Sequence, residues 1–161
     1  MRWILLLFAL AGCQPIGDQV VTDYDDWLRS TSFTTQEREI YRGADGIGIV
    51  TARPVIVMSP DGTGYAVLTN VRRRDVNGPR IDRITSQGVT LDYRRHDRLF
   101  THCIDGCQRA EIGAIVLSRD AFTLAARTGL PLRIWGQRGR YEGTVPAEAF
   151  ARVLTEAGAD G

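Results

Sequence analysis

The apolar and polar positions between Thr22 and Gly43 predict helical structure. The apolar positions in this segment are Tyr24, Trp27, Leu28, Ile40 and Tyr41. Thr31 and Ser32 interrupt the pattern, and Thr34 stands three residues before Glu37, the spacing of a capping box that opens a new helix. We therefore expect two short helices, or one broken helix, ending at Gly43.

From residue 47 onward the pattern changes to short runs rich in β-branched residues, which favour strands. These runs cover residues 47–52, 54–58, 65–71, 79–85, 89–93, 99–103 and 110–117. Pro, Asp and Gly gather between several of them, most clearly at residues 60–64, and such clusters are typical of turns. The spacing predicts an antiparallel meander.

The last third of the chain carries two helix signals on either side of a predicted hairpin. Ser118 can cap a helix through Arg127, with Gly129 beyond its end. The runs 131–135 and 141–144 predict the hairpin, and Pro146 then opens a final helix. Its apolar face holds Val145, Ala149, Phe150, Val153, Leu154 and Ala157 at helical spacing. We expect Phe150 to be a core residue.

Together these patterns predict an α+β fold. We expect a mostly antiparallel β-sheet with an N-terminal helix or helices, one short internal helix and a C-terminal amphipathic helix. Residues 22–158 are enough for a single α+β domain. A chain of this length buries about 68–70% of its unfolded surface, so folding requires no metal, and we expect no cofactor.

The first thirteen residues have the layout of an export signal. Arg2 precedes an apolar run, and small residues then lead to a cysteine in Leu10-Ala11-Gly12-Cys13. The run is far shorter than the roughly 20 apolar residues that span a bilayer. The motif resembles the lipobox of bacterial lipoproteins, which implies that residues 1–12 are removed and Cys13 carries the lipid.

Residues 13–21 would then form a tether between the lipid and the domain. Gln14, in place of an Asp, favours the outer membrane, facing the periplasm. A buried first helix, or a signal peptide cut elsewhere, is the alternative interpretation of this segment.

Charge excludes some partners. All 20 basic residues are Arg, against 19 Asp and Glu, so loss of Arg2 leaves the domain near neutral. Net charge therefore indicates neither a nucleic-acid partner nor attraction to an anionic membrane.

Two cysteines remain after Cys13, and they flank a short turn. Cys103 and Cys107 are separated by three residues that include Asp105-Gly106, a strong turn former. A three-residue hairpin loop would place them opposite each other, near disulfide distance. Closing this ring would contribute about 2 kcal/mol. A redox-active pair and a metal site completed by His96 and His102 are the alternatives, but the spacing matches neither Cys-x-x-Cys nor common zinc patterns, so we expect no metal.

The run Phe100-Thr-His-Cys103-Ile-Asp-Gly106-Cys107 is followed by an apolar strand, a short helix, a strand and an amphipathic helix. Over roughly residues 99–155 this order resembles the C-terminal half of the invasion-associated locus B family of exported bacterial proteins. The N-terminal half lacks the early cysteines and tryptophan strand of that family. The resemblance implies a periplasmic β-rich module.

A locally basic stretch between residues 72 and 98 is the candidate contact surface. Arg72 and Arg74 would share one strand face, since side chains alternate along a strand, and Arg94 and Arg95 lie further along. Such a stretch forms either a solvated, ion-paired face or an anion site for phosphates, glycan or an acidic partner.

No nucleophile and base stand in a spacing typical of catalysis, so we assign no catalytic residue. We expect a non-catalytic, lipid-anchored cell-envelope module that binds an envelope protein or glycan, with its oligomeric state open. A periplasmic hydrolase or glycan-active enzyme, or a small-ligand or lipid carrier, is the alternative.

Overall fold

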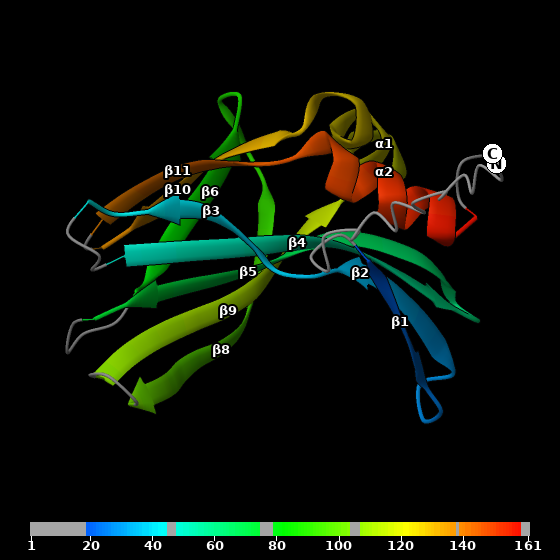
Figure 1. The fold of residues 1–161 in the computed structure, drawn as a ribbon, viewed down its shortest axis with the longest axis horizontal. Coiled ribbons are helices and arrows are strands. Elements are labelled where there is room, and N and C mark those ends of the chain that lie inside the picture. Colours follow the sequence, from blue (N-terminus) through cyan, green and yellow to red (C-terminus); the bar gives the residue numbers. More distant parts are fainter. Residues whose placement is uncertain (1–18, 45–47, 75–78, 104–106, 138, 159–161) are drawn as a thin grey trace, which may run out of the picture.

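A computed structural model describes residues 19–44, 48–74, 79–103, 107–137 and 139–158, with side chains omitted for 97–103 and 107–108 (Figure 1). The strands are β1 (Val20–Asp25), β2 (Ser30–Thr35), β3 (Arg38–Arg42), β4 (Gly48–Ser59), β5 (Gly62–Arg73), β6 (Ile81–Ser86), β7 (Val89–Thr90), β8 (Asp92–Cys103), β9 (Cys107–Leu117), β10 (Leu130–Gly136) and β11 (Gly139–Val145). The helices are α1 (Arg119–Thr128) and α2 (Ala147–Glu156).

Seven strands form a large antiparallel sheet in the order β1-β2-β4-β5-β9-β8, and β3 pairs with one end of β4. Its centre is the long hairpin of β4 and β5, which pair from Gly48↔Arg73 to Ser59↔Gly62. The smaller sheet has the order β11-β10-β6-β7.

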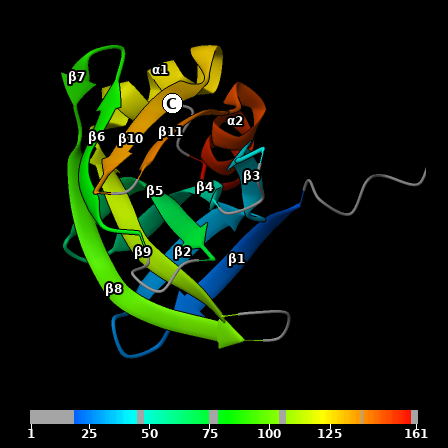
Figure 2. The ribbon, with the colours of Figure 1, turned by 90° about the vertical axis from the view of Figure 1, so that its left-hand side faces the viewer.

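The small sheet and the two helices lie side by side on one face of the large sheet (Figures 1 and 2). We call this face inner and the opposite face outer. The core between the layers holds Val50, Ile56, Val67, Val71, Ile84, Ile115, Ile134 and Val153, all fully buried. Helix packing is anchored by Phe122 and Phe150, whose rings meet edge to face with centroids 4.9 Å apart.

The two sheets approach each other closely where β11 runs beside β3. A Cβ atom on Gly143 would overlap the backbone carbonyl of Ile40, so only glycine allows this approach. On the other side of the small sheet, the Leu91 N–H donates to the carbonyl of Ile84 at 2.9 Å. The first contact joins the two layers, and the second extends the β6–β7 pairing by one residue before β8 begins.

The predicted fold class, an α+β fold with an N-terminal helix or helices, is wrong. Residues 22–43 form most of β1 and all of β2 and β3 rather than helices, and the described residues hold two helices within a mostly antiparallel β-structure. β1 begins at Val20, inside the segment expected to be a tether.

Thr34 and Glu37, the residues of the predicted capping box, form hydrogen bonds to the sheet instead. The Thr34 hydroxyl donates to the carbonyl of Pro54 at 2.8 Å, and the Glu37 carboxylate accepts from the Thr51 hydroxyl at 2.8 Å. Both contacts are to β4, so pairing with a long central strand overrides the local helix signal. Trp27 and Leu28, taken as a helix face, lie in the turn between β1 and β2 and are 92% and 64% exposed.

The two helices lie where their caps indicate. The Ser118 hydroxyl accepts from the Ala121 N–H at 3.1 Å, and Gly129 ends α1 at a φ of 73°. Pro146 precedes α2, which buries Ala149, Phe150, Val153 and Leu154. Neither helix approaches the length and apolarity needed to cross a membrane, and the described residues hold no other.

Candidate functional site

The face of the small sheet that points away from the core, which we call its outer face, gathers charged and aromatic side chains into one surface. Along β10, Leu130, Leu132 and Ile134 are buried, so Arg133 and Trp135 point away from the core. On β11 the buried residues Tyr141 and Val145 likewise leave Arg140, Glu142 and Thr144 outward.

Trp135 forms the centre of this surface. It lies opposite Arg83 on β6 and Arg140 on β11, and each guanidinium carbon is 5.3 Å from the indole centroid. Both contacts are cation–π interactions. The indole N–H is buried and has no hydrogen-bond acceptor among the described residues. The indole ring therefore contacts two guanidinium groups, one from each neighbouring strand.

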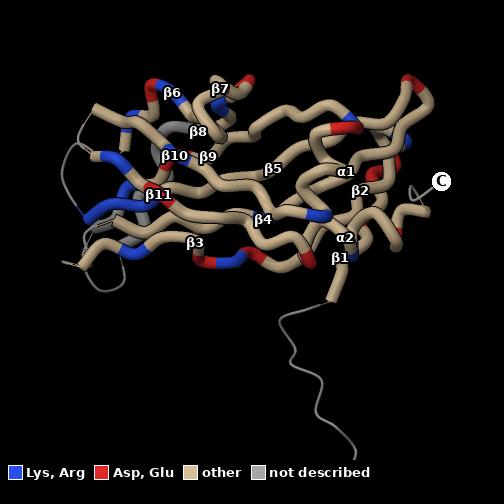
Figure 3. The backbone as a smooth tube through the Cα atoms, turned by 90° about the horizontal axis from the view of Figure 1, so that it is seen from above, with Lys and Arg blue, Asp and Glu red and all other residues tan. Residues whose placement is uncertain are grey.

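A third arginine joins through Glu142. The Glu142 carboxylate accepts from Arg133 at 2.9 Å and from Arg140 at 3.0 Å, and all three side chains are about half exposed. The cluster thus combines three guanidinium groups with one carboxylate. Figure 3 shows arginines concentrated toward the end of the molecule where β10 turns into β11.

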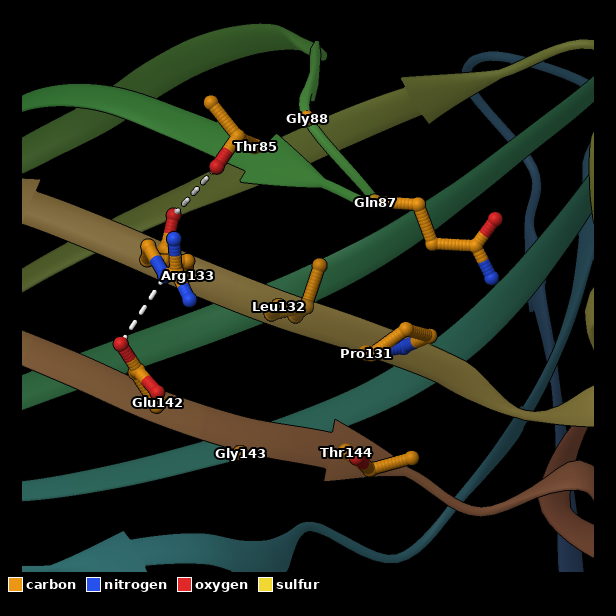
Figure 4. A pocket seen from close by; sticks show the side chains of 9 residues that line it. All are labelled: Thr85, Gln87, Gly88, Pro131, Leu132, Arg133, Glu142, Gly143 and Thr144. Carbon is orange, nitrogen blue, oxygen red and sulfur yellow. Dashed lines mark hydrogen bonds and ion pairs between the residues drawn. The ribbon is translucent and has the colours of Figure 1, made fainter.

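A surface groove of about 630 Å³ runs beside this cluster. Its lining residues are Thr85, Gln87, Gly88, Pro131, Leu132, Arg133, Glu142, Gly143 and Thr144, which come from three strands and one turn (Figure 4). Figure 4 shows Pro131 between Gln87 and Thr144, with Thr85 beside Arg133. The groove offers hydrogen-bonding groups and an apolar floor next to fixed positive charge.

The turn between β6 and β7 shapes one end of the groove. Gln87 and Gly88 have φ values of 49° and 87°, the left-handed pair that a tight two-residue hairpin turn requires. Figure 4 shows the Gln87 side chain extending away from Thr85, along the same side as Pro131 and Thr144.

The four predicted arginines are spread over several places. Arg73 reaches inward to the Tyr141 hydroxyl at 3.1 Å, so the neighbouring Arg72 lies on the outer face of the large sheet. Arg72 is half buried there, and its Nε has no acceptor among the described residues. Arg74 is exposed just beyond β5, and Arg94 is exposed in an ion pair with Asp92 at 3.1 Å.

Arg95 points inward and belongs to a buried cluster around Glu111, whose side chain is 1% exposed. The Glu111 carboxylate accepts from Arg95 Nε at 2.8 Å, from the Tyr93 hydroxyl at 3.1 Å and from the Ile81 N–H at 3.1 Å. Burial, and then the charge of Glu111, raise the pKa of Tyr93 well above its usual range. Through Ile81 this cluster binds β6 to the large sheet.

The remaining predicted site residues are the three cysteines. Cys13 and residues 104–106 lie outside the described residues. The β8–β9 register places Cys103 opposite Cys107, and the disulfide between them stays a prediction. Among the described residues, no three His, Cys, Asp or Glu side chains gather as a metal site.

Arg83 belongs to the predicted basic stretch and contacts Trp135. We did not predict the other residues of the cluster, which are Trp135, Arg133, Arg140 and Glu142. Their position on one sheet face could have been inferred from the sequence. The predicted strands 131–135 and 141–144 alternate, and antiparallel pairing around a short turn places Arg133 opposite Glu142. Comparison of the chain with protein-family models, with curated proteins and with solved structures yields no significant match.

Proposed function

We propose that this protein is a lipid-anchored cell-envelope module that binds an anionic glycan through the outer face of its small sheet, without turning it over. The observation that carries the proposal is the arrangement of Arg83, Arg133 and Arg140 around Trp135, beside a groove.

Guanidinium groups suit carboxylates and phosphates because their planar forks donate two parallel hydrogen bonds. Two of these groups contact an indole ring and two share the Glu142 carboxylate, so part of their side-chain freedom is already lost before binding. The hydroxyls and amide along the groove can bind sugar hydroxyls. An acidic or phosphorylated sugar matches both parts of the surface.

Binding is favoured over hydrolysis at this site because of how its carboxylate is used. Glu142 engages two arginines at once, an arrangement that fixes side chains rather than one that delivers protons to a substrate. The carrier alternative needs space between the layers, and that space is filled by fully buried side chains such as Ile84, Ile134 and Val71.

The test is calorimetry with an oligogalacturonate, a phosphorylated disaccharide and a neutral oligosaccharide of matched size. We expect the two anionic probes to bind and the neutral one to bind much more weakly. Arg133→Ser combined with Arg140→Ser should lower affinity at least about tenfold, since charge-assisted hydrogen bonds contribute about 1.5–3 kcal/mol each. Arg94→Ser, an exposed ion-paired arginine of the large sheet, is the matched control. Equal loss in both variants would contradict the proposed site.

The lipid anchor is tested separately. Intact mass of the mature protein should correspond to a chain beginning at Cys13 with acyl groups attached. Cys13→Ser should release the protein from membranes or leave the signal uncut. An unmodified chain beginning at Met1 in the membrane fraction would refute the anchor and leave the glycan test unaffected.

A further inference from the structure

The β1–β2 hairpin carries four of the eight large apolar side chains that are exposed among the described residues. Val21, Tyr24, Trp27 and Leu28 fall within eight residues, and each is about half exposed or more. Trp27 is 92% exposed. In Figures 1 and 2 the turn of this hairpin stands out from the body on the side away from the helices.

The exposed turn is also held in a fixed shape. The Asp25 carboxylate accepts from the N–H groups of Trp27 and Leu28, both at 2.9 Å. Arg29 adopts a φ of 49°, a left-handed conformation that a non-glycine residue rarely takes. An ordered turn that exposes an indole ring and a leucine side chain together is suited to contact with an apolar surface.

We propose that this hairpin tip, centred on Trp27 and Leu28, inserts into the interfacial region of the bilayer that carries the anchor. The proposal rests on the lipid anchor proposed for Cys13. Tryptophan and tyrosine favour the membrane interface because one part of the ring is apolar and another is polar, and Tyr24 lies close to Trp27 in the chain.

The length of the tether supports a bilayer as the occupant. Seven residue steps separate Cys13 from Val20, a reach of at most about 25 Å. β1 runs for about 20 Å from Val20 to the turn. A tether running back along β1 can therefore place the lipid at the level of Trp27, so anchor and hairpin meet the same surface.

The charge of the hairpin indicates which kind of bilayer it would bind. The hairpin carries Asp23, Asp25 and Asp26 against a single Arg29. An anionic surface would repel this tip, so the proposed partner is a zwitterionic headgroup layer. Tip and anchor would act together, since a tethered group binds at a high effective concentration.

The experiment uses Trp27 as the single fluorophore and replaces the lipid anchor with a synthetic attachment to the vesicle. A chain beginning at Gln14 with an N-terminal histidine tag is held on phosphatidylcholine vesicles by nickel-chelating lipid, which makes the result independent of acylation. Trp135→Phe leaves Trp27 as its only tryptophan. We expect its emission to shift to shorter wavelength and to be quenched by brominated phosphatidylcholine. The reciprocal variant Trp27→Phe reports Trp135, which should not be quenched.

A second test compares two exposed leucines, Leu28 in the hairpin and Leu124 on α1. Without nickel lipid, Leu28→Ser combined with Trp27→Ser should lower partitioning onto phosphatidylcholine vesicles at least about tenfold. Leu124→Ser on α1, where Leu124 is 59% exposed, should change it little. Phosphatidylglycerol vesicles should bind the unaltered protein more weakly. Quenching of Trp27 no greater than that of Trp135 would overturn the proposal, whatever mass analysis shows for Cys13.

Discussion

Glu111→Ala tests whether the buried carboxylate fastens the small sheet to the large one. The substitution leaves three donors facing an empty space: the Arg95 guanidinium, the Tyr93 hydroxyl and the Ile81 N–H. Arg95 keeps one hydrogen bond, from Nη2 to the Ile81 carbonyl at 2.9 Å, but its charge loses the carboxylate that balances it.

Removing one partner of a buried ion pair costs about 3–5 kcal/mol. We expect a loss in this range from the free energy of unfolding of Glu111→Ala. Glu111→Gln retains the volume and an acceptor oxygen, so its cost should be smaller, about 1–3 kcal/mol. The double variant with Arg95→Ala should lose less than the sum of the single losses, because the two groups depend on each other.

The assay is urea unfolding at neutral pH followed by tryptophan fluorescence and circular dichroism. Glu142→Ala is the control, since that carboxylate is 46% exposed and exposed pairs contribute at most about 1 kcal/mol. If Glu111→Ala cost no more than Glu142→Ala, the buried cluster would not hold the layers together and our argument would fail.

Three further predictions concern other parts of the molecule. Burial beside Glu111 raises the pKa of Tyr93 in the folded state, so stability should fall as the pH rises past about 10, the value in an unfolded chain. Tyr93→Phe should lessen that fall in urea titrations. Phe150→Ala should cost about 3–5 kcal/mol, and a cost below about 1 kcal/mol would mean that α2 is not docked. Cys103→Ser should lower stability by about 2 kcal/mol, and free thiols in the denatured, unreduced protein would refute the disulfide.

The sequence was sufficient where local chemistry and tertiary structure agree. Ser118 and Gly129 cap α1 with their own atoms, and the apolar stripe of α2 packs into the core. Each signal needs only neighbouring residues, so it can be interpreted without knowing the fold.

The sequence was insufficient where a distant strand decides the outcome. Thr34 and Glu37 have helix-capping spacing, yet both bind groups of β4. The basic stretch was similarly ambiguous, since Arg94 and Arg95 are adjacent but point to opposite faces, one to Asp92 and the other to Glu111. The cluster at Trp135 joins residues from β6, β10 and β11, and the β6–β10 pairing brings together segments that the local pattern does not connect.

That pairing also has a consequence for the order of folding. Ile84 of β6 pairs with Ile134 of β10, whereas the β4–β5 hairpin closes at Ser59 and Gly62. Contacts between distant segments form slowly, because a long loop must close before they stabilise anything. We therefore expect the β4–β5 hairpin to form before β6 joins β10. During refolding, β-sheet circular dichroism should recover before affinity for an anionic glycan, which needs Arg83 beside Trp135.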